Sequence, residues 1–561
     1  MMTRWQYALR RLLLFCALLL SFSCATAQEK DSAIASAHPL ATAAGHEILA
    51  RGGNAFDAAV AVAAALAVVE PYASGLGGGG FFLLHRARDG HQVVVDARET
   101  APGRARPELY LDRDGKPVRG ATTQGGTAAG IPGTPAGLAH VAGRYGLLPL
   151  ADSLAPAIRL ARDGFAVDER YARIAGLRER YLRDAAEAGR IFLDGNRAPQ
   201  AGWLLRQLEL AATLERLGRE GSRGFYGGLV ADALVESVNR AGGIWQPEDL
   251  ANYRVIEREP LRIRYRGATI TTTPLPSAGG IALAQCLYML ERVELTSPRA
   301  PRDAHFLIEA LRRAFHDRAF YLGDSDFVGV PVDDLTSRAH AAQLAASIRP
   351  DAATRSEALG PEMPAPAGTS TTHLSVIDST GNRVAATLTI NLLFGSGVVA
   401  RGTGVLLNNE MDDFTLEPEL PNAFRLRGGA ANAVAPGKRP LSSMTPTFVE
   451  DGKGVLVLGA PGGSRIVSQV LLAVLDYLGA PSVDLAGIAL APRYHHQWWP
   501  DRVEIEPEGF TGEWRAALEA KGHRLQVVKR KWGNMQLAFK SKQTGAAQAA
   551  SDPRGSELGW Y

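Results

Sequence analysis

The chain has 561 residues, of which 46% are hydrophobic and 21% are charged, and its formal net charge is +3. This is the composition of an ordinary globular protein that is long enough to bury several cores. So small a net charge provides no basic surface for nucleic acid or for an anionic membrane, which excludes those two classes of partner.

The first 27 residues have the layout of a cleavable secretory signal. Three arginines within the first 11 residues precede a short apolar run over residues 12–20, and Ala-Thr-Ala at 25–27 supplies the small residues that a signal peptidase needs. The apolar run is too short to span a bilayer. The sequence therefore predicts a signal peptide over residues 1–27, no stable membrane span, and a periplasmic or secreted protein.

A lipid anchor on Cys24 is the alternative fate of this N-terminus. Such an anchor requires a leucine three residues before the cysteine, but Ser21 stands there, so this interpretation is less favoured. Cleavage after residue 27 would leave Cys286 as the only cysteine. The exported chain would then contain no intramolecular disulfide.

The N-terminal half is expected to alternate helices with one pair of strands. An alanine-rich apolar run at residues 58–69 follows Gly52-Gly53-Asn54 and stops before Pro71, as a buried helix should. Strands are expected over residues 81–84 and 93–95, and further helices within 151–240 and 305–321.

Residues 75–80 fit the pattern GxGxxG, which is typical of dinucleotide-binding loops. Such a loop follows a strand and opens a helix, whereas this one follows a predicted helix and precedes a predicted strand. We therefore interpret the run as a tight turn whose backbone passes closely beneath a cavity.

The residue pattern changes near residue 370, from a proline-rich segment to alternating apolar residues. Residues 350–370 contain four prolines among small and acidic residues, which predicts a flexible, exposed linker. Directly after it, apolar residues recur at period two between 374 and 390 around Gly381-Asn382, which predicts two paired strands. Later strands are expected at 404–407 and 455–458, and helices at 467–478 and 514–521.

Several common catalytic motifs are absent. No GxSxG occurs, so the sequence gives no indication of a nucleophile-elbow hydrolase. His46-Glu47 begins like a zinc-protease motif, but Ala50 stands where the second histidine is required. His495-His496 are direct neighbours that point in different directions and are better explained as packed structural residues. The sequence therefore predicts no metal site and no other cofactor.

A hydroxyl nucleophile without a side-chain base remains. If the peptide bond before a threonine is cut, the freed α-amine lies beside the hydroxyl, and its pKa of about 7.7–8.0 suits proton transfer near neutrality. Thr371-Thr372-His373 lies where the predicted linker meets the first predicted strand. At this location, cleavage of one peptide bond would make the threonine N-terminal, and the sheet that follows would hold it in place.

The segment that begins at Thr371 resembles the start of the small subunit of gamma-glutamyltranspeptidases, which are N-terminal nucleophile hydrolases. The resemblance covers nearly the whole chain in the right order. It includes residues 52–59, 96–99, 243–253, 274–280, 371–376, 389–391, 408–414, 439–444, 461–465 and 491–497.

The resemblance implies a fold and a processing event. The fold would be an α/β (α+β) structure, a four-layer αββα sandwich in one domain, with strands from both halves of the chain in its two central sheets. Thr371 would attack the carbonyl of Ser370, so that the cleavage site lies between Ser370 and Thr371. The products would be a large subunit (28–370) and a small catalytic subunit (371–561) that remain together as a heterodimer.

The resemblance also implies catalytic roles. Thr371 would attack the gamma-glutamyl amide of glutathione or a related compound and form an acyl-enzyme, which water or an acceptor amino acid or peptide would resolve. Thr389 would orient Thr371. Gly462 and Gly463 would present backbone N–H groups to the oxyanion, because only glycine lets the backbone approach so closely.

Substrate recognition would have to hold a glutamate head with a carboxylate and an ammonium. Arg98 would bind the carboxylate, where a guanidinium fork fits best, and the Ser442 and Ser443 hydroxyls would add hydrogen bonds. The side chains implied to receive the ammonium are Asn391, Glu410 and Asp413.

Two alternatives remain open. A cephalosporin or glutaryl acylase of the same superfamily would act on substrates without the α-amine, against which Arg98 and Asp413 together argue. An unprocessed binding protein would be recognised by its failure to cleave itself. Many bacterial relatives have glutamine where this chain has Glu410, which adds a negative charge near the substrate amine. Several have a tyrosine on a lid loop where this chain has Phe424, so the hydroxyl contact of such a lid to the Asn391 region would be missing here.

Overall fold

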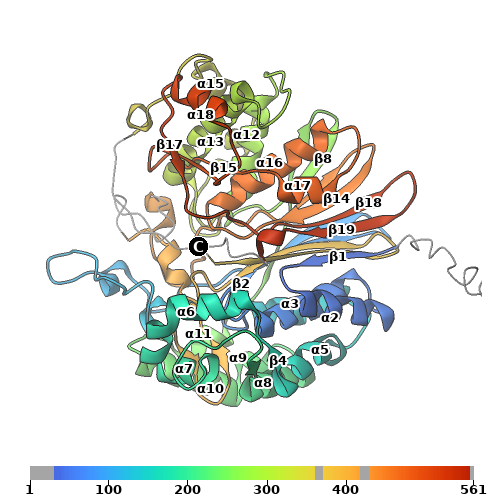
Figure 1. Cartoon of the computed structure of the whole chain (residues 1–561). Helices are drawn as coiled ribbons and strands as arrows, with labels where there is room; N and C mark the ends of the chain where they lie inside the picture. Colours follow the sequence, from blue (N-terminus) through green and yellow to red (C-terminus); the bar gives the residue numbers. More distant parts are fainter. Residues whose placement is uncertain (1–30, 361–369, 417–428, 556–561) are drawn as a thin grey trace, which may run out of the picture.

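The structure is a computed structural model that describes residues 31–360, 370–416 and 429–555. Two six-stranded sheets lie face to face in the middle of the molecule, with helices covering both outer faces (Figure 1). The predicted α+β sandwich of four layers is therefore confirmed. The expected signal peptide and Phe424 lie outside the described residues.

Both main sheets are antiparallel throughout, and each combines strands from before and after residue 370. The order in the first sheet is β1 (Ala33–Ser36), β9 (Thr372–Ile377), β10 (Arg383–Thr389), β2 (Gly79–Arg86), β3 (His91–Ala97) and β6 (Ile256–Arg258). The order in the second is β19 (Ala547–Ser551), β18 (Gln536–Ser541), β14 (Gly454–Gly459), β13 (Thr447–Glu450), β8 (Ala268–Thr272) and β7 (Leu261–Tyr265).

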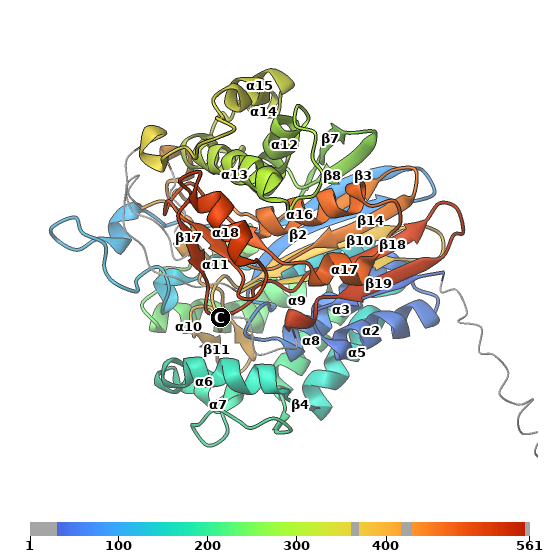
Figure 2. The ribbon, with the colours of Figure 1, turned by 45° about the horizontal axis from the view of Figure 1, so that its top comes forward.

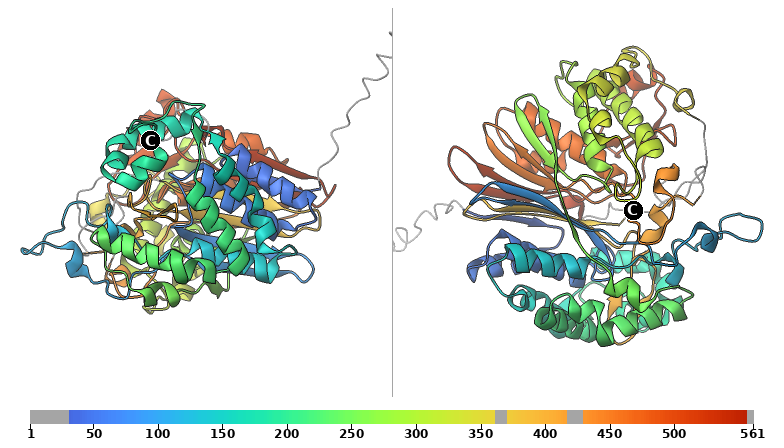
Figure 3. Two further views of the ribbon diagram at one scale, coloured as in Figure 1. Left: turned by 90° about the horizontal axis from the view of Figure 1, so that it is seen from below. Right: turned by 180° about the vertical axis from the view of Figure 1, so that it is seen from behind.

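Helices form the two outer layers, one beyond each sheet (Figures 2 and 3). The first sheet is covered by α2 (Pro39–Ala50), α3 (Ala55–Val69) and α4 (Thr134–Tyr145), with α5 (Leu150–Asp163) and α8 (Leu208–Glu220) behind them. The second is covered by α12 (Gly279–Leu290), α16 (Arg465–Gly479) and α17 (Leu485–Leu490), with α13 (Pro301–Tyr321) packed on α12.

The remaining elements are short or peripheral. The helices are α6 (Glu169–Asp184), α7 (Ala186–Phe192), α9 (Arg223–Tyr226), α10 (Gly228–Arg240), α11 (Pro247–Ala251), α14 (Val332–Leu335), α15 (Arg338–Ala346) and α18 (Gly512–Glu519). The strands are β4 (Phe165–Ala166), β5 (Leu204–Leu205), β11 (Val399–Ala400), β12 (Val405–Leu406), β15 (Tyr494–His495), β16 (Val503–Ile505) and β17 (Leu525–Val527).

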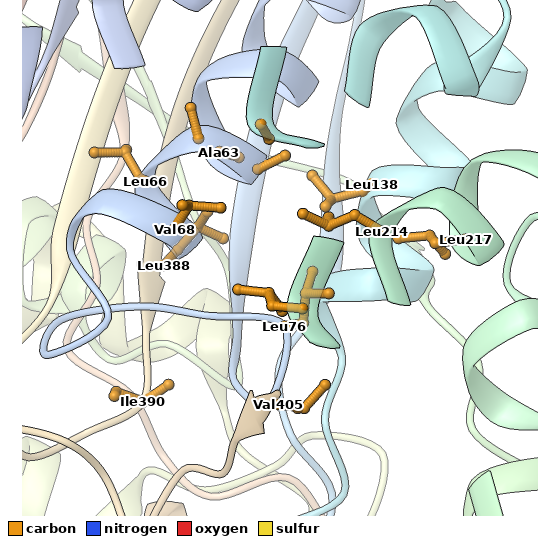
Figure 4. Packing of buried hydrophobic residues seen from close by; sticks show 14 of the residues in the cluster. Ala63, Leu66, Val68, Leu76, Leu138, Leu214, Leu217, Leu388, Ile390 and Val405 are labelled. Atoms are coloured by element: carbon orange, nitrogen blue, oxygen red, sulfur yellow. The ribbon is translucent and has the colours of Figure 1, made fainter. Parts of the chain in front are cut away.

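Helix α3 is the centre of the core behind the first sheet. Asn54 caps its N-terminus and exchanges hydrogen bonds with Asp57 in a capping box. Every residue of the helix is buried, because alanine and valine allow close packing on all sides. Figure 4 shows its side chains among leucines of β10 and α8. The helix predicted from the apolar run is thus confirmed, and it packs against β9, which follows Thr371, and against β10.

The glycine run at 75–80 contains the expected turn, in which the Gly78 N–H donates to the carbonyl of Gly75 at 3.1 Å, but the close backbone approach is to a strand. A Cβ at Gly78 would collide with the carbonyl oxygen of Thr389, and one at Gly80 would collide with that of Thr387. The glycines are needed because backbone passes against backbone, where β2 pairs with β10. They bring the large N-terminal half of the chain directly against the strand that carries Thr389.

The first part of the predicted linker is held by hydrogen bonds rather than free. The carbonyl of Arg349 lies 2.8 Å from His305 Nε2, the Thr354 N–H donates to Glu309 at 3.1 Å, and the Ser356 hydroxyl donates to the carbonyl of Trp498 at 2.6 Å. Residues 350–360 therefore differ from a flexible linker. Residues 361–369 lie outside the described part of the chain.

Glu309 makes this anchoring dependent on pH. Burial alone would raise the pKa of Glu309, but the charges of Arg312 and Arg313 and the hydrogen bond from Thr354 outweigh it and lower the pKa to about 2. Since this value lies below the 4.5 of an unperturbed glutamate, ionised Glu309 stabilises the fold above pH 4.5. That contribution is lost as the pH falls through the folded-state pKa.

We expect Glu309→Gln to lower the free energy of unfolding by about 3 kcal/mol at pH 7 and by less as the pH falls from 4.5 toward 2. Urea unfolding followed by circular dichroism at pH 7 and pH 3 measures this difference. A loss that is the same at both pH values would contradict the proposed ionisation of Glu309.

Two remaining questions from the sequence concern a membrane-spanning helix and the environment of Cys286. None of the helices within 31–360, 370–416 and 429–555 is long and apolar enough to cross a membrane. Cys286, whose environment the sequence left open, is buried in α12, and burial raises the pKa of its thiol.

Candidate active site

Thr371 lies at the junction that the sequence indicated, immediately before β9. Strands β9 and β10 pair in antiparallel register with Thr372 opposite Leu388, so the next pair in line is Thr371 and Thr389. The two threonine hydroxyl oxygens are 3.3 Å apart, and both side chains are buried. Two strands of one sheet therefore bring the predicted nucleophile and its predicted partner together.

The carbonyl of Ser370, in the peptide bond before Thr371, accepts hydrogen bonds from both threonine hydroxyls. The Thr371 Oγ1–H donates to the carbonyl oxygen of Ser370 at 2.7 Å, and the Thr389 Oγ1–H donates to the same oxygen at 2.9 Å. Thr389 in turn accepts from the backbone N–H of Asn391 at 2.8 Å. This arrangement places a hydroxyl beside the carbonyl that it would attack and polarises that carbonyl with a second hydroxyl.

Gly462 and Gly463 form the turn between β14 and α16. Their φ angles of +130° and +57° are in the region that favours glycine. Neither N–H group donates a hydrogen bond to another residue in the described ranges. Gly463 also lines the cavity next to Thr371, at the positive end of the α16 dipole. Both observations suit a site for a developing oxyanion.

Arg98 follows β3 and is surrounded by carboxylates of the protein itself. Its Nη1 contacts Glu410 and lies 3.4 Å from Glu99, and its Nη2 lies 2.6 Å from Asp413 Oδ2. Its Nε donates to the carbonyl of Pro440 at 3.2 Å. The residues expected at opposite ends of a substrate thus bind one another in this structure.

Burial and charge act against each other in this cluster. Burial alone would lower the pKa of Arg98, but the charges of Glu410, Glu99 and Asp413 outweigh it and the pKa is raised. Burial raises the pKa of Glu99 to about 7 and that of Glu410 well above its usual range, although Arg98 opposes both shifts. The cluster therefore favours either a proton on one of these carboxyl groups or a further positive charge beside them.

Three side-chain oxygen atoms around the cavity have no hydrogen-bond partner among the described residues. They are Asn391 Oδ1, Glu410 Oε2 and Ser443 Oγ. Buried polar atoms in folded proteins are almost always paired, so each of these calls for an explanation. Two of them are acceptors and suit an ammonium, whereas the hydroxyl can donate to a carboxylate.

The cavity itself is small, with a water-accessible volume of about 20 Å³. Ser442 lies in its wall, where its Oγ accepts from the N–H of Met444 at 3.1 Å. All the predicted catalytic and substrate-binding residues except Gly462 line this cavity. The residues that line the cavity are Arg98, Arg318, Thr371, Thr389, Asn391, Glu410, Asp413, Leu441, Ser442, Ser443, Met444, Gly463, Ser464 and Ile466.

Arg318 is the charged cavity residue that sequence reasoning missed. It lies on α13, within the helix predicted at 305–321, and it is buried. Burial lowers the pKa of Arg318 to about 10, and the neighbouring charge of Arg98 acts in the same direction against Asp413. One basic residue among several on a helix has no sequence signal that singles it out. Only the packing of α13 brings it to the cavity.

Comparison with known proteins gives the chain close relatives over nearly its whole length. A family model described as gamma-glutamyltranspeptidase matches residues 41–559. The glutathione hydrolase proenzyme of Escherichia coli (strain K12) is 41% identical over 530 residues, which cover 94% of this chain and 90% of that protein.

Acylases are also similar to the chain. The acylase ACY 1 proenzyme of Pseudomonas sp. (strain SE83) is 38% identical over 524 residues, which cover 91% of this chain and 90% of that protein. Among solved structures, the cephalosporin acylase from Bacillus halodurans has a TM-score of 0.82 at 28% identity, covering 94% of this chain and 95% of that one. The fold alone therefore does not distinguish the two activities.

Proposed function

The chain belongs to the gamma-glutamyltranspeptidase family, and we propose that it is an autoprocessing glutathione hydrolase and gamma-glutamyltransferase with Thr371 as its nucleophile. The observation that carries this proposal is the set of unpaired atoms around the cavity, Asn391 Oδ1, Glu410 Oε2 and Ser443 Oγ. They match the ammonium and the carboxylate of a gamma-glutamyl group in the same small space.

Self-cleavage begins with attack of Thr371 Oγ1 on the carbonyl carbon of Ser370. The C–N bond between the two residues breaks, an ester forms to the threonine oxygen, and the hydroxyl proton moves to the new α-amine. Water then hydrolyses the ester. Support comes from the hydrogen bond that Thr389 donates to the Ser370 carbonyl oxygen at 2.9 Å, since it stabilises charge on that oxygen.

Cleavage divides the chain into a large subunit (28–370) and a small one (371–561). The two subunits stay together as a heterodimer, because each central sheet contains hydrogen-bonded strands from both. Separating them would break every ladder between β10 and β2 and between β13 and β8. The signal peptide proposed at 1–27 directs the precursor to the periplasm or the outside of the cell.

Turnover uses the same hydroxyl on an external amide. The freed α-amine of Thr371 takes the hydroxyl proton as Oγ1 attacks the γ-carbonyl, and the leaving amine then receives it. The N–H groups of Gly462 and Gly463 stabilise the oxyanion, for which they carry no competing hydrogen bond in the described residues. Water or an acceptor amine resolves the gamma-glutamyl-enzyme.

On binding, the substrate takes over contacts that the side chains of the cavity otherwise make with one another. The α-carboxylate binds Arg98 and the hydroxyls of Ser442 and Ser443, and the α-ammonium binds Asn391, Glu410 and Asp413. The ammonium supplies the positive charge that the three carboxylates around Arg98 lack. Its binding also gives partners to the unpaired oxygens of Asn391 and Glu410.

An acylase activity is the second candidate, and the cephalosporin acylase of similar fold favours it. Gamma-glutamyl-p-nitroanilide and glutaryl-p-nitroanilide separate the two activities, because they differ only in the α-ammonium. We expect kcat/KM for the glutaryl compound to be lower by about 10⁴-fold, since its binding would leave buried acceptors unpaired.

The control for this comparison is the Thr371→Ala variant, which gives the background hydrolysis of each anilide. Equal or faster hydrolysis of the glutaryl compound by the wild-type protein would reject the gamma-glutamyl assignment and establish the acylase in its place. Transfer to an added dipeptide, measured by mass spectrometry of the product, then gives the share of transpeptidation.

A further inference from the structure

A buried carboxylate lies at the end of α3, outside the substrate cavity. Glu70 is the C-cap of this helix and is fully buried. The C-terminus of a helix is the negative end of its dipole, and burial disfavours an ionised carboxylate. Neither the helix nor the core therefore accounts for an acidic side chain at this position.

The two carboxylate oxygens of Glu70 have different partners. Its Oε1 lies 2.6 Å from Arg170 Nη1 and accepts from the Tyr72 hydroxyl at 3.2 Å. Its Oε2 accepts from the hydroxyl of Thr372 at 2.9 Å. Arg170 is itself buried, so it compensates the charge of Glu70, and Thr372 is the residue directly after the nucleophile. One side of the carboxylate is thus neutralised and the other is fixed on the small subunit.

The same turn also holds the residue before the nucleophile. The carbonyl oxygen of Tyr72 accepts from the hydroxyl of Ser370 at 2.7 Å. The Tyr72 ring packs against those of Tyr171 and Phe394, at centroid distances of 6.0 and 6.2 Å. Residues 70 and 72 therefore accept hydrogen bonds from both neighbours of Thr371, and they belong to one turn of the large subunit.

We propose that Glu70 is a positioning residue for Thr371, which it holds through the hydroxyl of Thr372 both before and after cleavage. This inference rests on the proposed function, in which Thr371 is the nucleophile. The bond from Ser370 to Tyr72 acts only in the precursor, since Ser370 ends the large subunit after the cut. The bond from Thr372 to Glu70 persists in the processed enzyme, where the first residues of the small subunit are no longer tethered by a peptide bond.

The test is a pair of substitutions at Thr372 that differ in the hydroxyl. Thr372→Val keeps the shape of the side chain and leaves the ion pair of Glu70 with Arg170 intact, whereas Thr372→Ser keeps the hydroxyl. We expect Thr372→Val to slow self-cleavage and to lower kcat about ten- to hundredfold with KM unchanged, which is the effect of losing a hydrogen bond to a charged group. Thr372→Ser should restore both rates to near the wild-type values.

A double-mutant cycle identifies Glu70 as the partner. Glu70→Asp keeps the charge beside Arg170 but shortens the reach to Thr372, so it should lower kcat in the wild-type background and have no further effect beside Thr372→Val. Glu309→Gln is the matched control, because it removes a buried carboxylate that pairs with arginines away from the cavity. It should lower the melting temperature with kcat unchanged.

Two results would overturn the proposal. One is a Thr372→Val variant that cleaves and turns over at the wild-type rates, and the other is an effect of Glu70→Asp that is undiminished in the Thr372→Val background. Self-cleavage is scored by mass spectrometry and needs no external substrate. A wild-type protein that cleaves at Thr371 but hydrolyses no gamma-glutamyl amide would therefore reject the proposed substrate and leave the test of Glu70 valid.

Discussion

The Thr371→Ala variant is expected to remain a single uncut chain and to lose at least about 10⁴-fold in kcat, which is the order of loss when a catalytic nucleophile is removed. The reason is that one hydroxyl performs both self-cleavage and turnover. This hydroxyl lies 2.7 Å from the Ser370 carbonyl oxygen. Alanine has no hydroxyl that could attack the carbonyl carbon. Intact mass spectrometry of the purified protein measures the first effect, and hydrolysis of gamma-glutamyl-p-nitroanilide measures the second.

Thr371→Ser is the control for this prediction, since it retains a hydroxyl and should still be cut. In the wild-type protein, fragments covering 28–370 and 371–561 are expected, so the same spectrum also tests signal removal after residue 27. A new terminus at Thr372 would assign the nucleophile to the neighbouring threonine. A single uncut wild-type chain would contradict the mechanism and favour the binding-protein interpretation.

The Arg98→Ala variant is expected to lose about 10²- to 10³-fold in kcat/KM, mainly through a higher KM. Arg98 is fully buried, and its removal leaves Glu99, Glu410 and Asp413 close together without their common partner. Breaking a buried ion pair on one side typically costs about 3–5 kcal/mol. Steady-state kinetics with the gamma-glutamyl anilide separates the change in KM from the change in kcat.

Two further variants show whether charge or geometry matters at Arg98. Arg98→Lys keeps the charge but not the planar fork, and it should recover only part of the affinity. Arg313→Ala removes a buried arginine that pairs with Glu309 on α13, so it should lower stability while KM stays unchanged. An Arg98→Ala protein with wild-type KM would exclude Arg98 from carboxylate binding.

Much of the fold could be predicted from local patterns. The apolar run with a cap and a following proline became α3, and the period-two residues around Gly381 became the hairpin of β9 and β10. These predictions succeeded because each element carries its own periodicity and its own start and stop signals. Their assembly into four layers came from family resemblance, since no local pattern encodes which sheet faces which.

The candidate site could be predicted only where a motif marked it. The segments around Arg98, Thr371 and Gly462 carry such motifs, and the structure gathers them at one cavity or its rim. Arg318 and Glu70 have no motif, because a basic residue in a helix and an acidic one after it are common in any sequence. Local composition cannot say which of them packing will bury beside the nucleophile.

By itself, the sequence determined some of the helices and strands, the chemistry available at Thr371 and the family to which the chain belongs. Only the tertiary structure decided that Arg98 is paired with Glu410 and Asp413, that Asn391 and Ser443 retain unpaired atoms, and that residues 350–360 are held rather than free. The physical reason is the distance along the chain between the residues that interact. Periodicity and capping act between residues a few positions apart, whereas these contacts join residues that are tens to hundreds of positions apart and meet only when the sheets pack.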